Sequence, residues 1–233
     1  MFNCTSTNSI FYVVTKTNNT VNFPSLEIAE KMFDCTFYHI PTPNYDSEKH
    51  LTSGTTFNLP KLVIGDRMFY SNYYLNAANM ILPKLQSANE MFAACNSLES
   101  FNTSTEGQLK NLVEARYMFS DCILNEDSVI GIINCLRNNQ GLTQEKLDKG
   151  TYDYLLTTTA KATLREDKTP FSIGTMDIDY NANIPFKTGL LQQILAIEGV
   201  ELIEETQNNT KIAVTNANNA KWTVNLSPQT PLS

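Results

Sequence analysis

Few residues of this chain could carry out chemistry, and their spacing limits what they could do. Asp177, Asp179 and Asn181 form a D-x-D-x-N motif, which is how a calcium-binding EF-hand loop begins. That loop requires a glycine where this chain has Ala182 and a glutamate where it has Thr188, so an EF-hand is excluded. The remaining alternatives are a looser cation site and a strand that runs into an Asx turn, and we favour the turn.

Cysteine and histidine side chains are the other candidates for metal binding or nucleophilic chemistry. The chain has five cysteines, which is an odd number, and no CxxC pair occurs. Neither histidine lies beside a cysteine cluster, so we expect neither a disulfide framework nor a zinc site. Glycine-rich phosphate loops and G-x-S-x-G are absent, as is a paired-carboxylate motif. We therefore predict a protein that is not an enzyme, with no catalytic residue, metal ion or cofactor. The residues considered are Cys4, Cys35, Cys95, Cys122, Cys135, His39 and His50.

The charge of the chain argues against two classes of partner. Its net charge is −7, and no segment is basic enough to neutralise the phosphates of a nucleic acid or to bind an anionic membrane surface. The longest apolar runs, such as residues 10–14, are far too short to span a bilayer, and the N-terminus does not resemble a secretory signal. We expect neither nucleic-acid binding nor membrane insertion.

An internal repeat organises the first half of the chain. The dipeptide Met-Phe occurs five times and uses five of the seven methionines. Four copies follow the pattern apolar-Pro-x-Leu-x-x-Ala/Gly-x-x-Met-Phe, with Lys110 in place of the proline in the last copy. Equivalent leucines are 36, 23 and 27 residues apart, and a period near 23 fits one strand and one turn of helix per coil of a solenoid. The dipeptides begin at Met1, Met32, Met68, Met91 and Met118.

The repeated positions have simple structural interpretations. Apolar residues recur at i, i+3, i+6 and i+7, which predicts one buried face of a helical turn. The proline sets the corner before that turn, and the cysteine that follows Met-Phe is a small buried residue. The segment after Cys95, residues 98–101, can form the stacked strand. The alternative, in which the methionines and cysteines bind a soft metal, is disfavoured because a stacked core needs one such set per repeat.

The pattern Leu-x-x-Ala-x-x-Met-Phe-x-x-Cys-x-x-Leu resembles the BspA-like leucine-rich repeats of bacterial and protist surface proteins and of phages of gut bacteria. The resemblance covers about residues 1–125, and residues 84–98 are the best copy. The copy at Met68 lacks the cysteine, and Met1 and Met32 have a shortened Met-Phe-x-Cys, which is typical of degenerate end repeats. The resemblance implies contact with a protein or glycan on a cell or virion surface, without catalysis.

Beyond the repeat, the sequence predicts a small module of helices and strands. Residues 125–136 read as a closing helix with Asn125 as its cap, and residues 143–156 and 188–197 as further helices. Strands are expected at 171–178, 200–203, 211–214 and 222–226. The expected fold class is α/β, with a leucine-rich-repeat solenoid and closing helix at 1–136, a small α/β module at 137–226 and an unpacked arm at 227–233.

Aromatic side chains near two of the Met-Phe segments are the candidate binding residues. Clusters of tyrosines on the loops of a solenoid suit contact with a protein or a sugar, although half of each cluster could pack inward. The candidates are Tyr38, Tyr45, Tyr70, Tyr73 and Tyr74.

These observations favour a non-catalytic structural or interaction protein. The first hypothesis is a bacteriophage virion component, such as a fibre, tail-associated or capsid-decorating protein, that binds other virion proteins, further copies of itself or a host surface glycan. The alternative is part of a bacterial surface adhesin that binds a protein or glycan. Met1 begins inside the Met-Phe part of a coil, so we expect a partner or a neighbouring copy to cover that end.

Overall fold

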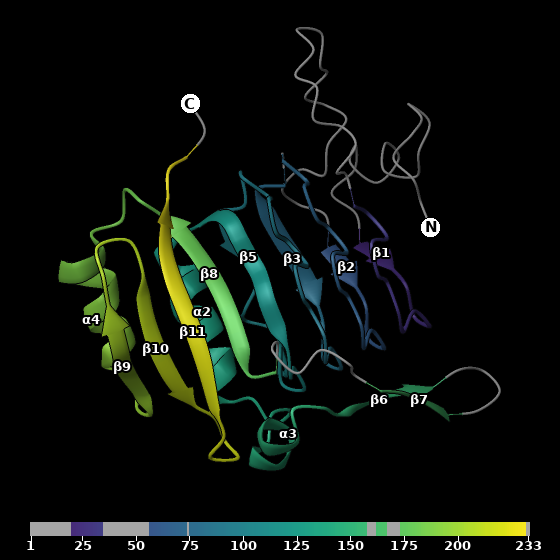
Figure 1. The fold of residues 1–233 in the computed structure, drawn as a ribbon. Coiled ribbons are helices and arrows are strands. Elements are labelled where there is room, and N and C mark those ends of the chain that lie inside the picture. Colours follow the sequence, from purple (N-terminus) through teal and green to yellow (C-terminus); the bar gives the residue numbers. More distant parts are fainter. Residues whose placement is uncertain (1–19, 35–55, 74, 158–161, 167–172, 232–233) are drawn as a thin grey trace, which may run out of the picture.

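The structure is a computed structural model, which describes residues 20–34, 56–73, 75–157, 162–166 and 173–231. It combines a four-stranded sheet, a five-stranded sheet and a two-stranded hairpin with few helices, so the expected mixed α/β class is confirmed. The repeats stack from β1 towards β5, and the five-stranded sheet continues from there to β9 at the opposite side of the molecule (Figure 1).

Each repeat contributes one short strand to the four-stranded sheet. These strands are β1 (Thr20–Asn22), β2 (Thr56–Asn58), β3 (Ala77–Ile81) and β4 (Ser100–Phe101). They pair in parallel in the order of the chain. The strand expected after Cys95 is therefore confirmed as β4.

A tight turn follows these strands at the proline position. Leu59, Pro60, Lys61 and Leu62 form one such turn, which the Leu62 amide closes by donating to the Leu59 carbonyl at 3.1 Å. The same bond recurs two repeats later at Leu112, where the amide donates to Leu109 at 3.2 Å. The predicted corner is confirmed, and it brings the exposed residues of successive corners to the same side of the stack.

The Met-Phe segments are not helical, which corrects the expected helical turns. Two consecutive β-turns form the segments at Met68 and Met91 instead. In the second described repeat the Met68 amide donates to the Gly65 carbonyl at 3.1 Å, and the Asn72 amide donates to Phe69 at 3.2 Å. The third residue of each turn is left-handed, with φ of 54° at Arg67 and 59° at Ser71. Successive turns bury every third residue much as a helix does, so the apolar spacing alone could not distinguish them.

Backbone hydrogen bonds between coils explain why turns are preferred to a helix. The Arg67 amide donates to the Asn89 carbonyl at 2.9 Å, and the Phe69 amide donates to Met91 at 2.9 Å. The Glu90 amide repeats the pattern by donating to the next coil. A helix would direct these amides and carbonyls to each other within one coil, whereas the turns leave them for the neighbouring coil.

The left-handed position of the turn gives an unusual stability prediction at Ala94, whose φ is 60°. A side chain in this region is strained and glycine is not, so Ala94→Gly is expected to raise the free energy of unfolding by about 0.5–1 kcal/mol. The neighbouring Ala93→Gly is the control, because Ala93 does not have a positive φ and is buried. Urea denaturation should show opposite signs for the two variants, and destabilisation by both would contradict the account.

A column of phenylalanine rings forms the centre of the stack. The rings of Phe69 and Phe92 stack at 5.5 Å with an interplanar angle of 6°, and Phe92 and Phe119 stack at 5.5 Å and 7°. Phe33 continues the column at 5.2 Å from Phe69. The Met-Phe dipeptide therefore places one phenylalanine of each coil over the next, as expected of a stacked core.

The last repeat passes directly into the five-stranded sheet. Its Met-Phe segment is β5 (Ala115–Leu124), which pairs in parallel with β8 (Thr175–Asn181). β8 pairs in parallel with β11 (Lys221–Gln229), and antiparallel β10 (Thr210–Thr215) and β9 (Val200–Glu205) complete the sheet.

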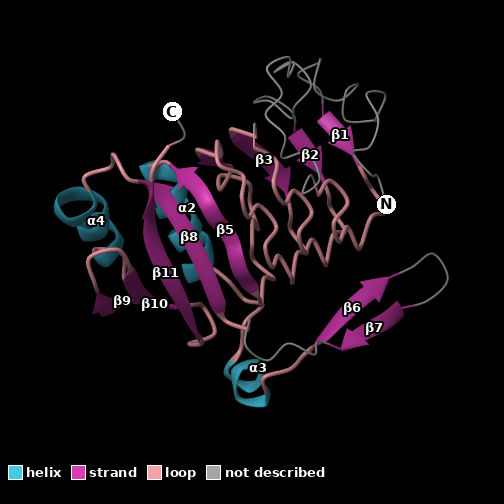
Figure 2. Ribbon diagram, turned by 45° about the horizontal axis from the view of Figure 1, so that its top comes forward, coloured by secondary structure: helices cyan, strands magenta, loops and turns pink. Residues whose placement is uncertain are grey.

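The predicted closing helix is confirmed as α2 (Glu126–Arg137). The Asn125 side chain caps it by accepting a bond from the Ser128 amide at 2.9 Å. The Ser128 hydroxyl in turn accepts a bond from the Phe101 amide of β4 at 3.1 Å. Figures 1 and 2 show α2 behind the five-stranded sheet. The helix therefore takes the place of a further strand after β4 and covers the apolar end of the stack.

The remaining predictions are partly corrected. The second helix, α3 (Gln144–Lys149), ends at left-handed Gly150, and β6 (Asp153–Thr157) and β7 (Ala162–Glu166) form a hairpin where the sequence suggested helix to 156. The helix expected at 188–197 is a π-helical turn, η2 (Phe186–Leu190), followed by α4 (Leu191–Leu195). The arm expected from Ser227 is also corrected, since β11 extends to Gln229 and pairs with Asn181.

Candidate functional site

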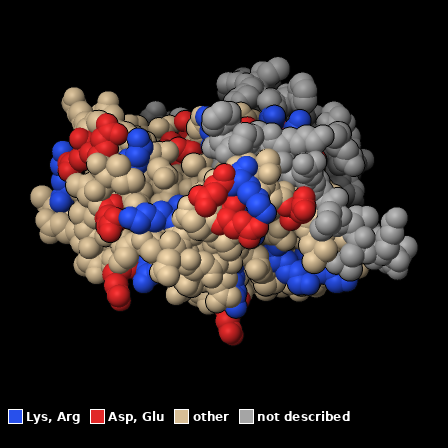
Figure 3. All heavy atoms as spheres, turned by 60° about the horizontal axis from the view of Figure 1, so that its bottom comes forward, with Lys and Arg blue, Asp and Glu red and all other residues tan. Residues whose placement is uncertain are grey.

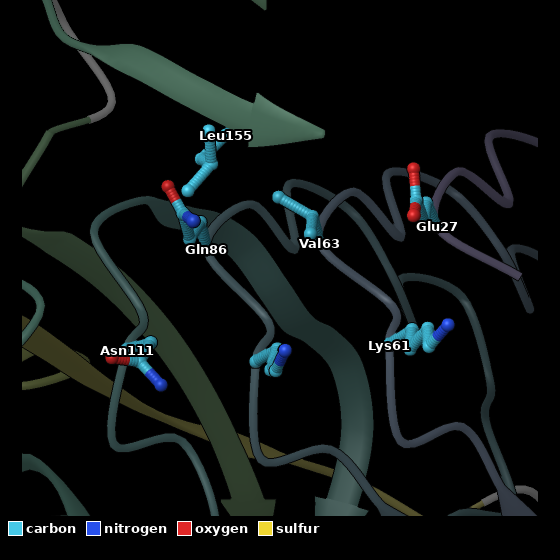
Figure 4. A pocket seen from close by; sticks show the side chains of 7 residues that line it. Glu27, Lys61, Val63, Gln86, Asn111 and Leu155 are labelled. Carbon is cyan, nitrogen blue, oxygen red and sulfur yellow. The ribbon is translucent and has the colours of Figure 1, made fainter. Parts of the chain in front are cut away.

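A groove of about 310 Å³ lies between the corners of the stack and the β6–β7 hairpin. It crosses four successive repeats, from Glu27 in the first described coil to Asn111 in the fourth. Lys61, Gln86 and Asn111 extend from successive coils, and Leu155 reaches towards them from β6 (Figure 4). The lining residues are Glu27, Lys61, Val63, Lys84, Gln86, Asn111 and Leu155.

The repeat itself sets the positions of the groove residues. Lys61, Lys84 and Asn111 each occupy the same place in the corner turn, directly before its last leucine. Backbone hydrogen bonds between coils hold the residues that follow each corner. The Val63 amide donates to the Glu27 carbonyl at 2.8 Å, and the Gln86 amide donates to the Val63 carbonyl at 2.9 Å. Lys61 and Lys84 belong to consecutive repeats, so their backbones lie on adjacent coils, which stack about 4.8 Å apart.

The charge of the groove differs from that of the rest of the surface. Neither Lys61 nor Lys84 forms an ion pair with another described residue, and both are exposed. Other lysines, such as Lys211 and Lys221, are paired with glutamates. Figure 3, which brings the side of α3 and the hairpin forward, shows acidic and basic side chains in small groups on a largely uncharged surface. The groove therefore offers two exposed lysines and one carboxylate, that of Glu27, in an acidic protein.

Two tyrosines fix the hairpin that forms the other wall of the groove. The Tyr154 hydroxyl donates to the Glu114 carboxylate, and the Tyr152 hydroxyl donates to the Gln86 carbonyl at 3.3 Å. Burial, and secondarily the charge of Glu114, raises the pKa of Tyr154 far above its usual range, so the phenol remains a donor. Leu155 follows Tyr154 on the strand, faces the opposite way and is 54% exposed.

A buried serine beside these tyrosines lies between two carboxylates. The Ser87 hydroxyl oxygen is 2.6 Å from Asp66 Oδ1 and 2.6 Å from Glu114 Oε1, and Asn89 Nδ2 donates to it at 3.2 Å. A nucleophilic serine would need access to substrate, but Ser87 is completely buried. The network joins three successive coils, and we assign it a structural role.

The predicted tyrosine site is only partly described. Tyr38, Tyr45 and Tyr74 lie outside the described residues. Tyr70 is half-buried beneath the Arg67 guanidinium, 4.2 Å from the ring centroid, and Tyr73 in the same coil is also half-buried.

The groove was missed by reasoning from the sequence, which singled out aromatic residues. The signal that could have found it is a lysine at the same corner position in two consecutive repeats, Lys61 and Lys84. The other wall was hidden because Leu155 falls in a segment that was expected to be helical.

The D-x-D motif terminates the stack. Tyr117 and Asp121 are the left-handed residues of the last repeat, and the equivalent amides of earlier repeats donate to carbonyls of the next coil. Here the Tyr117 amide donates to the Asp177 carboxylate at 3.0 Å, and the Asp121 amide donates to Asp179 at 2.8 Å. In the last repeat, these two carboxylates therefore accept the amide bonds that backbone carbonyls of the next coil accept in earlier repeats.

The Asx turn favoured after this motif is confirmed, because Asn181 Oδ1 accepts a bond from the Asn183 amide at 2.9 Å directly after β8. Within the described part of the chain, no three acidic, histidine or cysteine side chains are arranged to hold a metal ion.

Burial raises the pKa of Asp179 to about 6, against an opposing bond from the Asp121 amide and with smaller contributions from the charges of Asp121 and Asp177. A raised folded-state pKa stabilises the protein below the unfolded value near 3.8, and this stabilisation is lost as the pH rises through 6. Asp179→Asn keeps a hydrogen-bond acceptor without the charge. It should therefore raise the free energy of unfolding at pH 7.5 by about 1–2 kcal/mol, and with it the melting temperature, and it should match the wild type near pH 4.

Thermal denaturation between pH 4 and 8 measures this difference. Asp177→Asn is the matched control, because Asp177 accepts the equivalent amide bond one turn away. If the difference in stability between Asp179→Asn and the wild type stayed constant across the pH range, the titration of Asp179 would be excluded as its source.

The buried cysteines donate hydrogen bonds between coils. Cys95 Sγ donates to the Phe69 carbonyl at 3.1 Å, and Cys122 Sγ donates to Phe92 at 3.3 Å. In the repeat that lacks the cysteine, Asn72 takes its place and donates to Phe33 at 2.8 Å.

Burial raises the pKa of the Cys95 thiol to about 12 and that of the Cys122 thiol well above its usual value, so both stay protonated. Cys95, Cys122 and Cys135 are free thiols, in agreement with the expected lack of a disulfide framework for these three.

No protein-family model, curated protein or solved structure matches the chain. Among the described helices, none combines the length and the hydropathy that crossing a bilayer requires.

Proposed function

We propose that this chain is a non-catalytic interaction protein built on a leucine-rich-repeat solenoid of the BspA-like type. It acts as a component of a bacteriophage virion, as a fibre, tail-associated or capsid-decorating protein, and binds other virion proteins or the host surface. The alternative is a segment of a bacterial surface adhesin that binds a protein or glycan.

One contrast carries the proposal. The side chains that could do chemistry are used to join coils: Ser87 bridges two carboxylates, Cys95 donates to a carbonyl, and Asp179 accepts an amide. The groove along the corners, by comparison, presents Lys61 and Lys84, which form no ion pair with a described residue, and an exposed Leu155. A molecule whose reactive groups are internal and whose lateral surface is open is suited to contact with another macromolecule.

The repeated contacts support the solenoid part of the proposal. Equivalent residues of successive repeats make equivalent bonds, as the amides of Arg67 and Glu90 do with the coil that follows each. The stacked rings of Phe69 and Phe92 repeat with the same period. Such nearest-neighbour contacts are how repeat proteins are stabilised.

Fractionation of the phage that carries the gene tests the virion assignment. Virions purified on a density gradient and washed in high salt should retain the chain in a fixed ratio to the capsid protein, as measured by quantitative mass spectrometry. Recovery only from the soluble lysate would contradict the assignment. Release of the chain from intact bacteria by surface proteolysis would support the adhesin alternative instead.

A further inference from the structure

The largest exposed apolar side chains mark two separate surfaces. Leu155 is 54% exposed at the groove, and Ile203 and Leu202 are 53% and 43% exposed on β9. The hairpin and β9 lie at different sides of the molecule, with the sheet between them (Figures 1 and 2). No other large apolar side chain among the described residues is more exposed than these three.

β9 is the edge strand of the five-stranded sheet, and half of its six side chains are glutamates. It pairs with β10 on one side only, and residues 201–205 are all exposed. Glu201, Glu204 and Glu205 form ion pairs with lysines of the same sheet and of η2. Ion pairs between exposed side chains contribute little and exchange easily, so these carboxylates can accept other cations.

We propose that β9 of one copy docks in the groove of a second copy, so that the chains associate head to tail. This inference rests on the proposed assembly function and names its partner as the chain itself. The acidic strand meets Lys61 and Lys84, and Leu202 and Ile203 meet the apolar contact offered by Leu155. Docking thereby exchanges the lysines that pair with these glutamates within one copy for Lys61 and Lys84 of the other copy.

The dimensions of the two surfaces agree. The groove crosses three coil spacings, from Glu27 to Asn111, which is about 14 Å. The six residues of β9 span about 17 Å. Pairing of two β9 strands with each other is disfavoured by comparison, because it would bring two sets of three glutamates together.

The contact uses different surfaces on the two molecules, so it is heterologous and leaves a free groove and a free strand at the ends of every open oligomer. That property allows a test with two variants. Lys61→Glu/Lys84→Glu blocks the groove and leaves β9 intact. Ile203→Lys blocks the strand, places a cation against the basic groove, and leaves the groove intact.

Sedimentation equilibrium of the purified wild-type chain should show a mass that rises with concentration beyond that of a dimer. The dissociation constant should be on the order of 10 μM, as in small interfaces, and weaken about tenfold from 50 to 500 mM NaCl. Each variant alone should stay monomeric. An equimolar mixture of the two should form a heterodimer and nothing larger, because only one competent pair of surfaces remains.

Lys31→Glu/Lys149→Glu is the control, since it makes the same charge change at two exposed lysines outside the groove and should associate like the wild type. Circular dichroism melting establishes that all variants fold. The inference is overturned by a monomeric wild-type chain, by variants that still self-associate, or by a mixture that stays monomeric. A monomeric chain that nevertheless copurifies with virions would leave the proposed function standing.

Discussion

Asn139→Leu is expected to lower the free energy of unfolding by about 3 kcal/mol, because it removes a buried amide that joins three parts of the molecule. The side chain is completely buried. Its Nδ2 donates to the carbonyls of Leu109 at 2.8 Å and Leu112 at 2.9 Å, at the corner of the last repeat. Its Oδ1 accepts from the Asn216 side chain at 3.1 Å and from the Trp222 indole at 3.4 Å.

Leucine has the same number and branching of side-chain heavy atoms as asparagine and is somewhat larger, so the loss comes from unsatisfied partners and not from a cavity. The corner carbonyls and the indole would lose their bonds in a site that excludes water, and each buried group left without a partner costs about 1–3 kcal/mol. Urea denaturation followed by the fluorescence of the single tryptophan, Trp222, measures the effect. Asn134→Leu is the control on the exposed face of α2, and equal losses at the two positions would refute the role of Asn139.

Phe92→Ala is expected to destabilise the protein by about 4 kcal/mol, since it removes the ring at the centre of the column. Phe92 is completely buried, stacks on both Phe69 and Phe119 at 5.5 Å, and has Phe101 at its edge at 5.8 Å. A cavity in the middle of a stack loses contacts with both neighbouring coils.

The conservative control Phe92→Leu keeps most of the volume and should cost about 1–1.5 kcal/mol, less than half as much. Chemical denaturation of both variants gives the two values. If the alanine variant lost less than 1 kcal/mol, the coils would not depend on the column, and the stacked core would need another explanation.

Local signals in the sequence predicted much of the fold. The Met-Phe period identified the buried rings, Asn125 identified the start of α2, and the alternating segments near 200, 211 and 222 identified the last three strands. These predictions succeeded because capping, alternation and burial depend on neighbours in the chain.

The predictions that failed depend on partners distant in the chain. The spacing from Ala88 to Phe92 suits a helix and two β-turns equally, and only the bonds to the next coil select the turns. Similarly, Ser227 looked like the start of an arm, whereas β8 supplies the neighbour that extends β11. The groove depends on the hairpin lying against the corners, which no pattern within either segment announces.

The carboxylates of Asp177 and Asp179 also set a rule for how the molecule can change in length. Every coil before β5 presents the same amides forward and the same carbonyls backward, so a duplicated repeat inserted among them would find matching neighbours on both sides. After β5 that equivalence ends, because two side chains of β8 accept what a further coil would accept. Duplication or deletion of whole repeats within the gene could therefore lengthen or shorten the stack before β5, while its junction with the five-stranded sheet stays the same.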